Sequence, residues 1–318
     1  MSEYFDPSGA FTVRDGLRAG FARRDLDGKL LDRPFHGLRA VGGDETDHGL
    51  SAGERQRRTI ELRATQFNAY MGAHEFFSHT TAAVLWGLPL PLLDHEDLHV
   101  SVVSPCRAPR GAGVQGHQLA APGVEVVTHP RHLLRVTSAV VTWALMGGVL
   151  RHPYDLVAAA DAVVREDRVP GPRGRVIAPA LGTVAELEAV QLPKRRGVVA
   201  QREALRRVRS GVASRPETWM RLTIVDAGLA EPETDVDVWD AAGQFIGCVD
   251  LAYRALKIAF EYEGDHHRTD KAQWNRDLEK HELLVRAGWR VIRVTAQMVF
   301  VNPHLLIGLA RQALGDRS

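Results

Sequence analysis

Cysteine is scarce in this sequence. The 318 residues include 2 cysteines, Cys106 and Cys248, which lie far apart in the chain. Neither has a neighbouring cysteine with which to form a metal-binding knuckle, and a disulfide framework needs more cysteines than this. The sequence therefore excludes the small disulfide-stabilised secreted proteins and is typical of the reducing cytosol.

Long apolar runs are also missing. A membrane-spanning helix needs about 20 predominantly apolar residues, and no segment of the sequence approaches that length. The opening Met-Ser-Glu-Tyr-Phe-Asp-Pro is acidic and lacks the apolar stretch of a signal peptide. We therefore expect a cytoplasmic protein without a membrane partner.

No charge of one sign dominates. The chain has 40 Lys and Arg against 39 Asp and Glu, a net charge of +1. This balance neither requires nor excludes nucleic acid as a partner, so local clusters of charge matter more. Hydrophobic residues make up 45% of the chain and charged residues 25%, an ordinary globular composition, and the length suits two or three domains.

Polar and apolar side chains alternate along residues 257–263. The even positions hold Ile258, Phe260 and Tyr262, and the odd positions include Glu261 and Glu263. In a strand, the apolar set would face a core and the two carboxylates would project from the other face, roughly 6–7 Å apart.

A neighbouring strand that reaches Asp250 would add a third carboxylate to that face. Hard divalent cations bind such oxygen ligands. The alternative is a half-exposed hairpin whose polar face is acidic without binding a cation.

A turn at Gly264 and two histidines, His266 and His267, follow this strand. This composition is unusual for a strand edge that is only solvated. Because imidazole titrates near neutral pH, His266 or His267 is a candidate general acid or base.

Several segments near these residues form a recognisable set. They are Glu261-Tyr-Glu-Gly-Asp-His-His267-Arg, Gln273-Trp-Asn-Arg-Asp277, Gly288-Trp-Arg-Val-Ile-Arg-Val-Thr295 and Ser214-Arg-Pro-Glu217-Thr-Trp-Met-Arg-Leu222. Together they resemble the very-short-patch-repair (Vsr) branch of the PD-(D/E)XK nuclease superfamily over about the last third of the chain. The resemblance implies a DNA-cleaving domain with a restriction-endonuclease-like core.

The resemblance also implies roles for individual residues. Asp250 and Glu261 would hold Mg²⁺ or Mn²⁺. Glu217 would be an auxiliary acid on the opening helix, and His267 would lie beside the scissile phosphate. Glu263 occupies the position at which the superfamily usually carries a water-activating Lys, and this branch commonly has an acid there. Glu263 is therefore a further candidate catalytic residue, and the role of the Lys is left unassigned.

Two basic residues near the strand, Lys257 and Arg268, are candidate phosphate contacts. Lys257 lies on the charged side of the strand but roughly 13 Å from Glu261, too far to activate water there. A solvated charge is the alternative for Lys257.

For residues 210–318 the sequence predicts the order helix, three strands, helix, strand. The expected elements are a helix at Glu217–Ala227, a hairpin of Val236–Trp239 and Phe245–Leu251, a strand at Lys257–Tyr262, a helix at Gln273–Ala287 and a strand from Val291. Gly288 supplies the stop signal of the second helix.

The first 50 residues predict a small DNA-binding module. Two short helical patterns flank Gly20 and a ribbon-like segment follows, the order of a helix-turn-helix with a wing. This module resembles the winged helix of AbiEi-type antitoxins, which would place Arg23, Arg24 and Lys29 on the second helix as DNA contacts. A small helical cap with basic surface residues is the alternative.

Residues 60–200 resemble the α+β middle domain of the same antitoxin family. The segments Leu98–Ser104 and Val124–His129 are typical of strands, and Asp155–Arg165 is typical of a helix. The expected class of the whole chain is α+β, in three parts.

A basic segment runs from Lys194 to Arg209 with Glu203 as its only acid. Such a density of positive charge would supply phosphate contacts, which we assign to Arg206 and Arg207. A solvated, arginine-rich helix between domains is an equal alternative.

Two histidine pairs have spacings close to those of metal ligands on a helix. His74 and His79 are five residues apart, which places them about 140° apart on a helix and prevents them from sharing an ion. His95 and His99 have helical ligand spacing but lie among strand-forming residues. The sequence therefore predicts ordinary buried or exposed histidines at these positions.

Two functions remain from this evidence. The first is a DNA-binding protein with a metal-dependent endonuclease domain. The alternative is a non-catalytic, AbiEi-like regulator that uses the nuclease-type fold as a DNA-binding scaffold. The Lys missing from the motif favours the regulator, whereas the set Asp250, Glu261 and His267 favours the enzyme.

Overall fold

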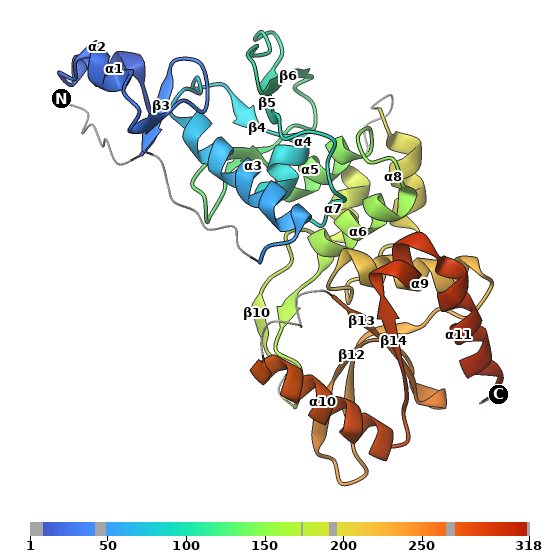
Figure 1. Ribbon diagram of the computed structural model, residues 1–318. Coiled ribbons are helices and arrows are strands. Elements are labelled where there is room, and N and C mark those ends of the chain that lie inside the picture. The colour runs from blue at the N-terminus through green and yellow to red at the C-terminus, as the bar shows by residue number, and fades with distance from the viewer. Residues whose placement is uncertain (1–8, 42–48, 173, 191–195, 265–270, 317–318) are drawn as a thin grey trace. The chain divides into compact units, whose positions relative to one another are not determined.

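A computed structural model describes residues 9–41, 49–172, 174–190, 196–264 and 271–316 of the chain, without the side chains of residues 271–274 (Figure 1). The chain divides into two compact units. The N-terminal unit comprises residues 1–149 with 189–198, and the C-terminal unit comprises residues 150–188 with 199–318. Both units combine helices with sheets, which agrees with the α+β class. His266, His267 and Arg268 lie outside the described residues.

The N-terminal unit contains two sheets. A small sheet has the strand order β1-β3-β2, and a five-stranded sheet has the order β6-β5-β4-β8-β7, in which the β5/β6 and β4/β8 pairs are parallel. The elements are β1 (Phe11–Thr12), α1 (Val13–Arg18), α2 (Arg23–Leu26), β2 (Leu31–Asp32), β3 (Leu38–Val41), α3 (Ala52–Asn68), β4 (Phe76–Phe77), α4 (His79–Leu85), β5 (Leu98–Val103), β6 (Val114–Leu119), β7 (Val126–Thr128), β8 (Arg135–Thr137) and α5 (Ala139–Met146).

One apolar core joins the two sheets of this unit. Phe35 and Leu38 of the small sheet region are buried in the same cluster as Ile60 and Phe67 of α3 and Phe77 of β4. The helix α3 begins with a capping box, in which Ser51 and Glu54 each bond to the backbone N–H of the other. Residues 9–41 thus share their core with the segment that follows.

The second helix of the N-terminal region is shorter than the sequence predicts. Helix α2 ends at Leu26, so Lys29 lies in the turn beyond it, and the prediction that Lys29 belongs to this helix is wrong. The physical reason is local, since Asp27 caps the helix and Gly28 disfavours its continuation. Arg23 and Arg24 do lie on α2, where Arg23 pairs with Asp27 at 3.0 Å.

The C-terminal unit opens with helices and a short hairpin and then forms its main sheet. Residues 150–188, which the sequence analysis placed in the middle domain, belong to this unit. The elements are α6 (Pro153–Val164), β9 (Asp167–Arg168), β10 (Val176–Ala178), α7 (Val184–Ala189), α8 (Val198–Leu205), α9 (Arg215–Asp226), β11 (Glu233–Trp239), β12 (Phe245–Tyr253), β13 (Ile258–Glu263), α10 (Lys271–Arg286), β14 (Arg290–Thr295) and α11 (Pro303–Gly315).

From α9 to β14 the elements run in the order helix, three strands, helix and strand. The sheet has the order β11-β12-β13-β14, with antiparallel pairs throughout except for the parallel pair of β13 and β14. A π-helical turn at Gln297–Val301 and helix α11 follow, and the sequence analysis did not anticipate either.

Helices cover both faces of this sheet (Figure 1). Phe260 of β13 is buried in one cluster with Met220 of α9 and Leu306 of α11, whereas Ala259 is buried in another with Leu284 of α10. Ile258 and Phe260 are fully buried as predicted, but Ala259 between them is fully buried too, because α10 covers the opposite face of β13.

Helix α9 is anchored on α6 through buried charged groups. Asp155 of α6 accepts hydrogen bonds of 2.7 Å from both Arg215 and Trp219 of α9. Asp161, also on α6, accepts from Thr218 at 2.8 Å and from Arg221 at 3.3 Å. Because buried ionic groups are tolerated only when their partners are in place, these bonds fix the position of α9 against α6.

Arg221 is the centre of this network. Its side chain is 1% exposed and also donates to Glu231 at 2.7 Å and to the carbonyl of Arg207 at 2.7 Å. Burial raises the pKa of Asp161 to about 6, and the charge of Arg221 opposes that rise.

We expect Arg221→Leu to destabilise the C-terminal unit by about 3–5 kcal/mol, because it leaves Asp161 buried without its cation. The matched control is Arg206→Leu, which removes an exposed pair with Glu203 and should cost at most about 1 kcal/mol. Urea unfolding followed by tryptophan fluorescence measures both. Equal effects of the two substitutions would contradict the anchoring role of Arg221.

Candidate metal centre

The carboxylates of Asp250 and Glu261 lie on adjacent strands. The pairing of β12 with β13 ends at Leu251 with Phe260, and Asp250 and Glu261 are the next residues on the two strands. The negative charge of Glu261 raises the pKa of Asp250, so the two carboxyl groups lie near each other. The two acids that the sequence analysis selected as metal ligands are therefore neighbours on adjacent strands.

Asp250 is held in place by the backbone of the neighbouring strand. Its Oδ2 atom accepts a hydrogen bond of 2.7 Å from the amide of Tyr262. Burial, with the negative charges of Glu217 and Glu261, raises the pKa of Asp250 to about 7, whereas the Tyr262 amide and Lys280 oppose the rise. Glu217 and Glu261 are thus close enough to disfavour ionisation of Asp250.

Glu217 enters the site from the first turn of α9. Its carboxylate accepts 2.8 Å hydrogen bonds from the amide of Ala213 and the hydroxyl of Ser214, which fix it at the start of the helix. The side chain is buried, and burial raises the pKa of Glu217 despite these bonds. Glu217 therefore combines a capping role with a negative charge beside Asp250.

Lys280 of α10 brings a positive charge to the pair, and the sequence analysis missed it. Its Nζ atom forms an ion pair with Oε1 of Glu261, and both side chains are largely shielded from solvent. The Lys280 ammonium therefore lies beside the Glu261 carboxylate.

Two features of the chain direct Lys280 to this place. Lys280 lies one helical turn before Leu284, which is fully buried against the sheet, so both side chains are on the same face of α10. The Lys280 side chain also crosses β12 at Gly247, where an added Cβ would lie 3.0 Å from its Cδ and Cε atoms. The spacing to Leu284 is the signal from which the sequence could have revealed Lys280.

Glu263 projects from the same strand as Glu261 but has a different partner. It forms an ion pair with the guanidinium of Arg293 on β14. Since its charge is offset there, Glu263 is a weaker candidate for a cation ligand than Asp250 and Glu261 are.

The acids of β11 are also paired. Arg168 bonds to Asp235 at 2.6 Å and to Asp237 at 2.8 Å, and the thiol of Cys248 donates to Asp235 at 3.0 Å. Both cysteines, Cys106 and Cys248, are free. The charges of Asp235 and Asp237 are therefore offset by Arg168.

Lys257 does not lie on the charged face of β13 as the sequence analysis predicted. It precedes the strand in a left-handed conformation, with φ of 48°, and its Nζ atom donates to the carbonyl of Ala287 at 2.9 Å. A cation at the end of α10 is favoured by the exposed carbonyls there. The structure thus shows a helix-capping contact for Lys257.

The basic residues near α8 have intramolecular partners. Arg206 pairs with Glu203 at 2.9 Å, Arg207 with Asp226 at 2.5 Å and Arg209 with Glu231 at 2.7 Å. The side chain of Arg206 is 76% exposed, whereas that of Arg207 is 22% exposed. Of the two predicted phosphate contacts, Arg206 is the more accessible.

The residues around Asp250 fit a hard divalent cation. Their donor atoms are carboxylate oxygens, which Mg²⁺ and Mn²⁺ prefer. Burial is the main cause of the raised pKa of Asp250, and a bound cation would relieve the added repulsion from Glu217 and Glu261.

No protein-family model matches the chain. Two uncharacterized proteins of Mycobacterium tuberculosis are similar to it, MT2308 of strain CDC 1551 / Oshkosh and Rv2248 of strain ATCC 25618 / H37Rv. Each is 28% identical over 253 residues, which cover 77% of this chain and 83% of the relative. Among the described helices, none has the length and apolar character needed to cross a membrane.

We expect Asp250→Asn to stabilise the metal-free protein at pH 8 and to have little effect at pH 4. The pKa of Asp250 is higher in the folded protein than in the unfolded chain, so stability from this group falls as pH rises from about 4 to about 7. After allowance for solvent screening, the gain at pH 8 should be about 1–2 kcal/mol, or a few degrees in Tm. Thermal unfolding in EDTA at the two pH values measures this difference in stability. A lower Tm of the variant at pH 8 would contradict the claim that ionised Asp250 destabilises the metal-free protein.

Proposed function

We propose that the chain is a metal-dependent endonuclease that hydrolyses phosphodiester bonds in DNA. The observation that carries the proposal is that the Asp250 and Glu261 carboxyl groups are neighbours on adjacent strands, with Lys280 paired to Glu261. The order of elements from α9 to β14 and the resemblance to the Vsr branch of the PD-(D/E)XK superfamily support it.

In this proposal Asp250 and Glu261 hold Mg²⁺ or Mn²⁺. The bound ion would polarise the phosphodiester and lower the pKa of a water molecule. The Tyr262 amide orients the Asp250 carboxylate, which reduces the reorganisation needed on binding. Glu217 adds negative charge behind Asp250 and raises the affinity of the set for a cation.

Lys280 takes the part that the motif Lys has in related nucleases. Its ammonium is held at the edge of the carboxylate pair by Glu261. From there it can orient the attacking water and stabilise the charge that develops on the phosphate oxygens. His267, outside the described residues, stays a candidate for proton transfer.

The non-catalytic regulator remains the second candidate function. The observation in its favour is that Glu263, at the position of the motif Lys, is engaged by Arg293 rather than turned to a substrate. A regulator would bind DNA through the same unit, and its carboxylates would neither hold a metal ion nor take part in cleavage.

We expect wild-type protein to cleave duplex, mismatched or nicked DNA in the presence of Mg²⁺ or Mn²⁺. Asp250→Asn and Glu261→Gln should each slow single-turnover cleavage by about 100-fold or more, since several kcal/mol of charge stabilisation is lost. DNA affinity should hold or rise, because repulsion from phosphate is reduced.

The control for these variants is Glu233→Gln, which removes an exposed carboxylate paired with Arg254 in the same sheet. It should cleave at the wild-type rate. If wild-type protein binds DNA tightly without cleaving any of these substrates, and both site variants bind alike, the regulator is correct.

Lys280→Met should slow cleavage by about 10–100-fold while Mn²⁺ binding is retained, because the ammonium acts on the phosphate and water rather than as a ligand. The matched variant is Arg286→Met on the same helix, whose exposed guanidinium pairs with Glu282. Cleavage rates and calorimetric Mn²⁺ titrations of both variants provide the readout. Unchanged cleavage in Lys280→Met would remove Lys280 from the mechanism.

A further inference from the structure

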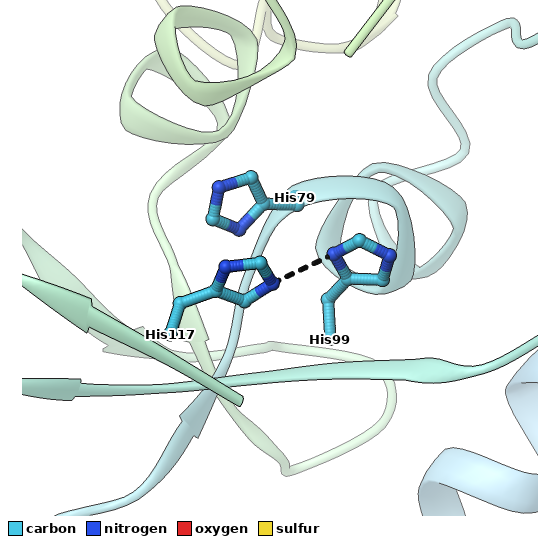
Figure 2. Close-up of side chains that lie close together, drawn as sticks. All are labelled: His79, His99 and His117. Carbon is cyan, nitrogen blue, oxygen red and sulfur yellow. Dashed lines mark hydrogen bonds between the residues drawn. The ribbon is translucent and has the colours of Figure 1, made fainter. Parts of the chain in front are cut away.

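Three histidines from distant segments converge in the N-terminal unit. His79 begins α4, His99 lies in β5 and His117 lies in β6. One ring nitrogen from each lies within 4.8 Å of those of the other two. Figure 2 shows the rings of His79 and His117 one above the other, with His99 beside them.

The distances between the rings are those of a nearly assembled ligand set. His117 Nε2 and His99 Nδ1 are 3.0 Å apart, and the centroids of the His79 and His117 rings are 4.0 Å apart. Two nitrogen ligands at about 2.0–2.1 Å from one tetrahedral Zn²⁺ are about 3.3–3.4 Å apart. Small side-chain movements therefore suffice to place three nitrogens around one ion.

The surroundings hold the rings in place. The Oγ atom of Ser78 lies 2.8 Å from Nδ1 of His79 and 2.6 Å from Oγ of Ser101. The pairing of β5 with β6 sets Ser101 opposite His117, and the amide of His99 donates to Thr81 at 2.8 Å. The three imidazoles are thus carried by hydrogen-bonded backbone rather than by a loose surface loop.

The protonation of the rings also suits a metal. Burial lowers the pKa of His99 to about 3, with further lowering by the charges of His117 and His95, and burial lowers the pKa of His117. Neutral imidazole is the form that binds metals. His99 and His117 therefore need not lose a proton to solvent before they bind an ion at neutral pH.

We propose that His79, His99 and His117 bind one borderline divalent transition metal, of which Zn²⁺ is the representative. Imidazole ligands select ions of this class over Mg²⁺ and Ca²⁺. Three histidines leave a fourth position for water or an anion, the arrangement of an open zinc site. The ion would tie the edge strand β6 to β5 and to the start of α4. This proposal is independent of the carboxylate centre in the C-terminal unit.

A fourth histidine provides the control. His95 stacks on His99 with centroids 6.0 Å apart, but its Nε2 atom lies 3.0 Å from the amide of Gln115 and it is not in the converging set. His95→Gln therefore changes a neighbouring imidazole without removing a proposed ligand.

The test is calorimetric titration of the full chain, stripped with chelator, with Zn²⁺ and with Co²⁺ as a spectroscopic probe. Wild-type protein should bind one ion at this site, with the visible absorption bands of tetrahedral Co²⁺. His79→Gln and His117→Gln should each weaken binding by at least about 10-fold and abolish the bands. His95→Gln and Asp250→Asn should bind within about twofold of wild type.

Thermal unfolding provides a second readout. Zn²⁺ should raise the Tm of wild-type protein and not that of His117→Gln, since an ion that binds the folded state stabilises it. Circular dichroism without metal establishes that each variant is folded. Absence of binding in wild-type protein, equal binding in His79→Gln and His117→Gln, or loss of binding in Asp250→Asn alone would each overturn the proposal.

Discussion

The candidate centre in the C-terminal unit depends on the crowding of like charges. Asp250, Glu261 and Glu217 are brought together by strand pairing and by the start of one helix, and burial increases their mutual repulsion. Lys280 offsets this repulsion through its ion pair with Glu261. Such an arrangement gains nothing in stability without a cation, and for this reason we propose that the acids bind one.

The surrounding structure is built to keep this arrangement in place. Arg221 and two buried aspartates of α6 fix α9, and α9 in turn carries Glu217 through hydrogen bonds to Ala213 and Ser214. The neighbouring acids Asp235 and Asp237 are offset by Arg168.

The parts that the sequence predicted are those set by local periodicity. Alternation along residues 257–263 predicted strand β13 and its buried face, and it selected Glu261 together with Asp250. The spacing of Lys280 to Leu284 places Lys280 on the sheet-facing side of α10, but its pairing with Glu261 depends on tertiary structure. Helical spacing excluded a pair of His79 with His74, and strand-forming neighbours excluded a pair of His99 with His95, whereas tertiary structure unites His79 and His99 with His117. The prediction for Lys257 was wrong because Lys257 itself adopts a left-handed conformation, so the alternation of β13 begins only after it.

The central claim is that Asp250 and Glu261 form a cation site, and Mn²⁺ titration by calorimetry tests it most directly. The titration compares wild-type protein with Asp250→Asn in a background of His117→Gln, which removes the histidine site from the measurement. We predict that the His117→Gln protein, in which Asp250 is intact, binds one Mn²⁺. Adding Asp250→Asn should abolish this binding while the fold is retained. Identical Mn²⁺ binding by the two proteins, or none by either, would contradict the account.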